Sequence, residues 1–215
     1  MSVESDEIER VRKYALVQLA THQIEKVMEI LPHEIPPSNG QSIGWVAYRG
    51  RRADGGSDRW FEVVSRWSTG TGYDGSGMTV ITGDSGDFIW NRSLFWMKRS
   101  IDSIHYFAEK VPHGIVTRHY SQDKFQEWLR DEMADAAKAL DERDLGGDAS
   151  QLIELRKAAQ EALDADVGEC QHDAYEWIVD AGFWDGGDLP DLEVFTPSFL
   201  WCRESIKLLL ARVEL

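Results

Sequence analysis

Apolar residues recur along the chain in two rhythms, which divide it into an N-terminal part with strand signals and a C-terminal part with helix signals. Residues 5–20 repeat apolar positions at helical spacing behind a serine and two acidic residues, which favour a helix start. Residues 23–31 fit either a continuation of that helix or a strand. Prolines with Asn39 and Gly40 then end regular structure.

Four short segments rich in β-branched and aromatic residues follow in close succession. They span residues 43–48, 60–67, 78–82 and 88–90. The connections between them are rich in glycine, serine and aspartate and are too short to contain a crossover helix, so consecutive strands are expected to pair antiparallel. The pattern predicts a β-meander of about four strands with one face left for helices to cover.

Helical periodicity dominates the rest of the chain, where apolar stripes predict several helices. The first four span residues 95–111, 125–140, 152–163 and 175–183. A final helix is expected to begin at Thr196 as its cap, with Pro197 in the first turn. Because its apolar stripe is unusually broad, we expect this helix to be buried in the core or at a partner interface.

Strands followed by helices, rather than strands alternating with helices, are typical of an α+β fold. We expect one α+β domain over residues 1–215, with a sheet-containing part at 1–120 and a helical C-terminal half at 121–215. No apolar run approaches the ~20 residues of a membrane helix. The first residues also lack an apolar signal segment. We therefore expect a cytoplasmic protein that does not contact a membrane.

The distribution of charge along the chain adds a second difference between its two parts. The chain has 38 Asp and Glu against 23 Lys and Arg, a net charge of −15, with 42% hydrophobic residues, enough for a folded core. Residues 1–120 carry a net charge of −1 and residues 121–215 a net charge of −14. Between Lys157 and Arg203 there are eleven acidic residues and no basic one. This balance disfavours direct binding to nucleic acid.

The acidic stretch predicts a surface that binds a basic partner. If residues 169–183 are helical, the four carboxylates of that helix recur at spacings of four, three and four residues and share one face. They belong to Glu169, Asp173, Glu176 and Asp180. They then repeat every ~5–6 Å, of the same order as the phosphate spacing of a nucleic-acid strand. The alternative is an ordinary solvated face. The candidate partner-binding residues are Glu169, Asp173, Glu176, Trp177, Asp180, Trp184, Asp185, Asp188, Asp191 and Glu193.

Other motifs suggest little chemistry. The segment GDSGD at 83–87 predicts a hairpin turn in which glycines supply positive φ and Asp84 accepts a backbone hydrogen bond. Cys170 and His172 provide at most half of a metal site, and two cysteines do not indicate a disulfide framework. We therefore expect no metal or cofactor, and no residue is assigned a catalytic role.

Three motifs spread over most of the chain occur together. They are MTVITGDSGDFIWNR at 78–92, YFAEKV at 106–111 and FLWC at 199–202. In combination they resemble the strand–GDxGxF–strand signature, the helix motif and the closing helix of a family of phage and prophage proteins of undetermined biochemical role. The resemblance implies a virus-encoded accessory protein that works in the bacterial host cytoplasm.

These observations lead to three hypotheses. The first is a non-enzymatic phage accessory protein that binds and inhibits a host macromolecule, part of a defence or nucleic-acid-processing system, through an acidic surface that mimics nucleic acid. The second is a small enzyme or nucleotide-binding protein with its site near Asp84, Asp87, Tyr106 and Glu109. The third is a virion or assembly component that oligomerises through the apolar final helix.

Overall fold

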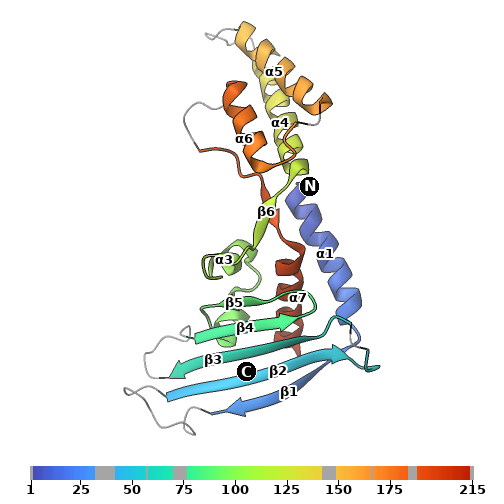
Figure 1. Cartoon of the computed structure of the whole chain (residues 1–215), viewed down its shortest axis with the longest axis vertical. Coiled ribbons are helices and arrows are strands. Elements are labelled where there is room, and N and C mark those ends of the chain that lie inside the picture. Colours follow the sequence, from blue (N-terminus) through green and yellow to red (C-terminus); the bar gives the residue numbers. More distant parts are fainter. Residues whose placement is uncertain are drawn as a thin grey trace. The chain divides into compact units, whose positions relative to one another are not determined.

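The computed structural model describes residues 2–31, 42–56, 58–69, 77–141, 149–165, 167–183 and 188–213. The chain forms two compact units, and most of their elements are labelled in Figure 1. The sheet unit comprises Ile8–Thr117 and Phe195–Leu215, and the helical unit comprises Met1–Glu7 and Arg118–Val194. The last helix of the chain thus belongs to the same unit as the strands.

Five antiparallel strands form the main sheet, in the order in which they follow along the chain. They are β1 (His22–Ile30), β2 (Ser42–Arg52), β3 (Phe61–Thr69), β4 (Gly77–Gly83) and β5 (Phe88–Trp90). Buried and partly exposed positions alternate along β2 and β5, as expected of strands with one covered face. The predicted α+β meander is confirmed, and residues 23–31, left open between helix and strand, belong to the additional strand β1.

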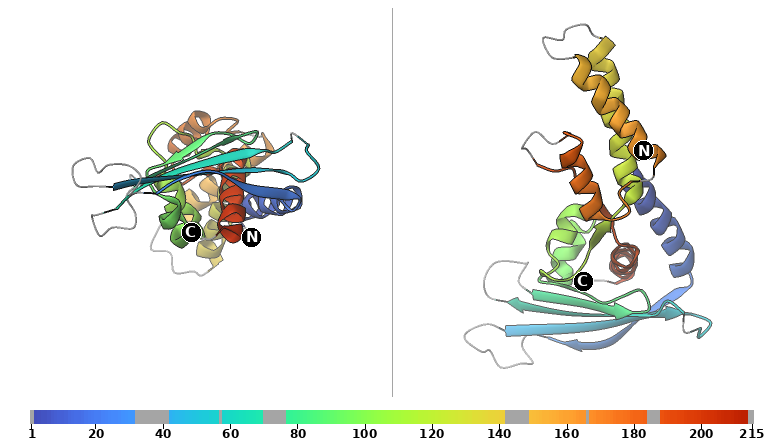
Figure 2. Two further views of the ribbon diagram at one scale, coloured as in Figure 1. Left: turned by 90° about the horizontal axis from the view of Figure 1, so that it is seen from below. Right: turned by 45° about the horizontal axis from the view of Figure 1, so that its top comes forward.

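Four helices of the sheet unit lie on one face of this sheet (Figure 2). They are α1 (Val3–Leu19), which joins this unit from Ile8 onward, α2 (Leu94–Ser100), α3 (Ile104–Glu109) and α7 (Pro197–Arg212). The fully buried Trp90 lies in the core between them. Its indole N–H donates to the carbonyl oxygen of Phe107 at 3.2 Å, and its ring lies 4.9 Å from that of Phe107 and 6.4 Å from that of Phe199.

The final helix α7 is buried around most of its circumference, as its broad apolar stripe predicted. Ten of its 16 residues are buried in the sheet unit. The Thr196 hydroxyl accepts a hydrogen bond from the backbone N–H of Phe199 at 3.2 Å, and Pro197 occupies the first turn, so the predicted cap is confirmed. The apolar surface on which oligomerisation through this helix would depend is therefore already used inside the unit.

The single helix expected over residues 95–111 is instead two helices, α2 and α3, separated by Ile101, Asp102 and Ser103. The cause lies about a hundred residues away, in α7. The buried Arg203 guanidinium donates to the carbonyl oxygens of Ile101 at 2.9 Å and Asp102 at 3.2 Å, which takes up acceptors that a continuous helix would use internally. Its charge is balanced by the equally buried Glu204 at 2.9 Å.

The helical unit contains three helices and two three-residue strands among its described residues. They are β6 (Arg118–Tyr120), α4 (Gln122–Asp141), α5 (Ala149–Asp164), α6 (Gln171–Asp180) and β7 (Glu193–Phe195), the last residue of which belongs to the sheet unit. The stripes at 125–140 and 152–163 are confirmed as helices. Their buried residues form a second core, made of Phe125, Leu129, Ala159, Ala162, Ala174, Ile178 and Leu192. The paired strands β6 and β7 are too short to leave a pattern in the sequence.

Replacing Arg203 tests how strongly its buried contacts stabilise the sheet unit. We expect Arg203→Met to lower the free energy of unfolding by about 3–5 kcal/mol, because it leaves the Glu204 carboxylate buried without its partner. The control is Lys207→Met on the same helix, which removes a partly exposed ion pair with Asp102 (3.0 Å) and should cost about 0–1 kcal/mol. Urea denaturation followed by tryptophan fluorescence measures both, and equal losses would contradict this account.

The two cysteines should differ sharply in reactivity. Burial, with a smaller effect of the Asp87 carboxylate, raises the pKa of the Cys202 thiol to about 12, so little thiolate forms at neutral pH. Cys170 is exposed. We expect a thiol-specific reagent to modify one thiol per folded chain and the second only after unfolding. The Cys170→Ser variant should show no fast-reacting thiol, and a fast reaction in that variant would refute the assignment.

Candidate functional site

Charge divides between the two units even more sharply than the sequence halves indicated. The helical unit has 24 acidic residues and seven Lys and Arg, a net charge of −17, whereas the sheet unit has 14 acidic and 16 basic residues, a net charge of +2. The difference arises because the acidic start of the chain belongs to the helical unit and the basic residues of α7 belong to the sheet unit. All of the excess negative charge therefore lies on the helical unit.

Helix α6 presents three of the predicted carboxylates on one side. Ala174 and Ile178 are buried against the core, while Asp173, Glu176 and Asp180 are exposed. We call these three residues the α6 acidic face. Within the described part of the chain, no lysine or arginine lies within 4.0 Å of their carboxylates, and the imidazole Nε2 of His172 lies 4.0 Å from Glu176. No described lysine or arginine thus neutralises the charge of this face.

The helix is shorter than the expected 169–183, and Glu169 does not lie on it. Cys170 adopts an extended conformation as the N-cap, so the exposed Glu169 precedes the first turn. At the other end, the N–H of Gly182 bonds to the carbonyl of Val179 and that of Phe183 to the carbonyl of Ile178, both at 3.1 Å. With Gly182 at φ 79°, this is a Schellman motif that ends the helix.

Trp177 is partly buried and packs against the core of the helical unit. Its ring lies 6.0 Å from Phe125 in an edge-on arrangement and 5.4 Å from Phe183, which in turn packs against Trp128. Trp177 therefore supports α6 rather than standing out from it as an aromatic anchor. Of the remaining predicted residues, Asp188 is exposed ahead of β7, and Trp184 and Asp185 lie outside the described residues.

Asp191 and Glu193 instead belong to a cluster that fixes the start of β7. The Asp191 carboxylate pairs with Arg118 at 2.9 Å and Lys124 at 3.5 Å, and the Glu193 backbone carbonyl accepts from the same two side chains at 2.7 and 2.8 Å. Glu4 contributes a second carboxylate, 2.9 Å from Arg118. Partial burial opposes ionisation of Asp191, but the Glu193 N–H and Arg118 together lower its pKa. Two of the seven basic residues of the unit are thereby occupied.

Elsewhere in the unit, like charges act on one another. Partial burial, followed by repulsion from Asp135 and Asp131, raises the pKa of Glu132 on α4. Burial likewise raises the pKa of Tyr120 to about 12, and Asp173 of the α6 acidic face adds to that shift. Burial is the main cause of both shifts, and neighbouring acidic groups add to them.

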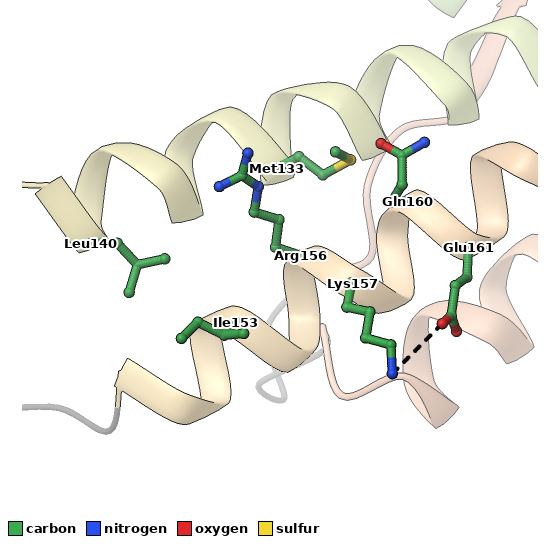
Figure 3. Close-up of a pocket in the computed structure, with 7 residues that line it drawn as sticks. All are labelled: Met133, Leu140, Ile153, Arg156, Lys157, Gln160 and Glu161. Carbon is green, nitrogen blue, oxygen red and sulfur yellow. Dashed lines mark ion pairs between the residues drawn. The ribbon is translucent and has the colours of Figure 1, made fainter.

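A hollow between α4 and α5 has a volume of about 380 Å³ (Figure 3). Met133, Leu140 and Ile153 form its apolar wall, and Lys157 pairs with Glu161 at its edge (3.8 Å). The groups around it do not form a nucleophile–base arrangement. Among the described residues, no three His, Cys, Asp or Glu side chains are placed to hold a metal ion, and no helix is long and apolar enough to cross a bilayer.

The GDSGD turn forms part of a second hollow, within the sheet unit. Gly83 and Gly86 have φ of 155° and 124°, and the Asp84 carboxylate accepts a hydrogen bond from a backbone N–H, that of Arg59 at 2.7 Å, which confirms the predicted turn. The hollow has a volume of about 410 Å³ and is lined by residues of α1, the turn before β3, the GDSGD turn and α7.

Among the residues proposed for a site here, Asp84 lines the hollow and the other three do not. The Asp87 carboxylate accepts from the Thr82 hydroxyl. Tyr106 and Glu109 both contact Lys110, whose Nζ lies 4.4 Å from the centre of the Tyr106 ring. The structure thus does not gather these four side chains into one site.

No protein-family model, curated protein or solved structure matches the chain. The interpretation of its function therefore depends on the geometry and electrostatics described above.

Glu132→Gln should stabilise the protein at neutral pH. A carboxyl whose folded-state pKa is raised favours folding when protonated, and that contribution is lost as pH rises through the folded-state pKa. The amide imitates the protonated form and removes repulsion worth about 0.2–0.5 kcal/mol. Thermal unfolding should show a higher midpoint for the variant at pH 7, with the gap closing at about pH 3, where the wild-type side chain is protonated.

The exposed Glu154 on α5 provides the control for this prediction. Glu154→Gln should not raise the midpoint at neutral pH. A gap between wild type and Glu132→Gln that persists unchanged at low pH would contradict the electrostatic explanation.

Proposed function

We propose that the protein is a binding protein whose helical unit occupies a basic surface on a partner protein, with the α6 acidic face at the contact. The observation that carries this proposal is the absence of a lysine or arginine within 4.0 Å of Asp173, Glu176 or Asp180 among the described residues. In a unit of net charge −17, these carboxylates are available to a cationic partner.

The spacing of the α6 acidic face supports a partner that normally binds nucleic acid. Asp173, Glu176 and Asp180 recur after three and four residues, about 4.5 and 6 Å along a helix axis, of the same order as phosphate spacing. A partner site built for a row of phosphates offers Lys and Arg side chains at comparable intervals. The helical unit would occupy that site in place of nucleic acid.

Electrostatics would mainly control association rate and choice of partner. A negative field of this size speeds encounter with a positive surface and repels acidic proteins and nucleic acid. Short-range affinity would come from apolar side chains beside the carboxylates, of which Val179 is 45% exposed on α6 and Leu189 is 38% exposed nearby in sequence. Trp177 is partly buried and packs against Phe125 and Phe183, so we assign it mainly to the support of α6.

The biological setting is also a proposal. The motifs at 78–92, 106–111 and 199–202 resemble phage and prophage accessory proteins, which supports a virus-encoded inhibitor of a host defence or nucleic-acid-processing protein in the bacterial cytoplasm. Occupation of a nucleic-acid site by an acidic helical unit would block that site without any catalytic step.

The triple variant Asp173→Asn, Glu176→Gln, Asp180→Asn tests the contact. Each lost ion pair is expected to cost about 0.2–1 kcal/mol, so binding to a captured host protein should weaken by about 0.6–3 kcal/mol in total. Affinity of the wild type should also fall steeply between about 50 and 200 mM salt, and duplex DNA should compete for the partner. Capture from a host lysate, mass spectrometry and titration of the purified partner provide the measurements.

The control replaces three exposed carboxylates of the sheet unit, Glu9→Gln, Asp58→Asn and Glu109→Gln, and alters net charge by the same amount. It should bind like the wild type. Equal binding by the α6 variant, or affinity that is indifferent to salt, would rule out the proposed contact.

A further inference from the structure

The hollow beside the GDSGD turn holds an arginine whose backbone is fixed from two sides. Arg59 has φ 65°, and it is the only non-glycine residue with positive φ in the described part of the chain. Asp84 accepts its N–H at 2.7 Å, and Nε2 of the buried His22 is hydrogen-bonded to its carbonyl oxygen at 2.9 Å. A strained conformation held by such contacts is typical of a residue with a functional side chain.

The Arg59 guanidinium is ordered by aromatic rings instead of by an ion pair. It lies 5.0 Å from the centre of the Trp201 ring and 5.9 Å from that of Tyr14. No described carboxylate lies within ion-pair distance of it, although Arg59 and Asp84 line the same hollow. Arg59 and Asp84 therefore line the hollow with opposite charges without forming an ion pair with each other.

The residues that line the hollow also include a serine whose hydroxyl has no hydrogen-bond partner. Ser85 Oγ is buried and has no hydrogen-bond partner. Ser198, in the first turn of α7, lines the same hollow. A buried hydroxyl without a partner is unfavourable, so it is expected where a ligand completes its hydrogen bonding.

We propose that this hollow binds a small zwitterion, a free α-amino acid with an apolar side chain. Arg59 and the Ser85 hydroxyl would donate to the carboxylate, and Asp84 would accept from the ammonium group. Val11, Pro197 and the half-exposed Tyr14 provide an apolar wall for the side chain. The volume of about 410 Å³ lies within the range of small-molecule pockets.

Isothermal titration of the full-length protein with L-leucine and L-phenylalanine tests the proposal. Two analogues of phenylalanine act as matched probes, 3-phenylpropionate without the ammonium group and phenethylamine without the carboxylate, together with inorganic phosphate. We expect an amino acid to bind at least about tenfold more tightly than either analogue, since each analogue loses one charge-assisted contact. Equal binding of 3-phenylpropionate or phosphate would overturn the zwitterion, and no binding by either amino acid would overturn the site.

Two substitutions separate ligand binding from structural support. Arg59→Gly suits the positive φ and should leave the thermal midpoint unchanged or higher, while amino acid binding weakens by about 10–100-fold. Ser85→Ala should weaken binding by about 2–10-fold without loss of stability. The control Arg66→Gln removes a guanidinium that stacks on Trp45 outside the hollow and should not change binding. Unaltered binding by Arg59→Gly would refute the proposal.

Discussion

The packing of α7 against the covered face of the sheet determines how the rest of the chain is organised. This helix is buried on most of its sides and contributes Phe199 to the rings around Trp90. Directly before its cap, the N–H of Thr196 donates to the carbonyl oxygen of Thr117 at 2.8 Å. The chain therefore leaves the sheet unit after Thr117 and returns to it just before Thr196, at two positions that a hydrogen bond joins. A segment inserted in this way can form its own core without interrupting the sheet.

That separation allows the two units to differ in charge. The sheet unit is nearly balanced, and charges face each other across its strands, as in the pairs Arg49–Glu62 and Arg51–Glu25. The helical unit tolerates its excess because each exposed like-charge pair on a helix costs only about 0.2–0.5 kcal/mol, less than the burial of one core side chain contributes. Acidic residues distributed over the whole surface would make the protein equally soluble. Concentration on one unit instead produces a directional field, and this is why we favour recognition over mere solvation.

The sequence was informative where a local rhythm decides the structure. Segments rich in β-branched and aromatic residues located β2 to β5, helical periodicity located α4 and α5, and Thr196 with Pro197 located the start of α7. Sequence patterns did not predict the structure where a contact between residues far apart in the chain determines it. No local pattern reveals that Arg203 divides residues 95–111 into two helices, because that interaction joins positions about a hundred residues apart. The sequence likewise did not show that Trp177 packs against the core of the helical unit.

The GDSGD turn illustrates how a short motif acquires its role from tertiary structure. Its glycines and the hydrogen bond to Asp84 follow from turn chemistry, and that part was predictable. The donor to that carboxylate was not, since it is the N–H of Arg59, a residue in a conformation that no sequence rule assigns to arginine. The Asp84 carboxylate binds the backbone N–H of Arg59 and therefore does not neutralise the guanidinium of the same residue. Among the described residues, Arg59 of the sheet unit therefore has a guanidinium without an ion-pair partner, in a hollow that also holds an unused hydroxyl, whereas the α6 acidic face of the helical unit has no lysine or arginine partner. The two sites belong to separate units, so the loss of one by substitution should leave the other intact.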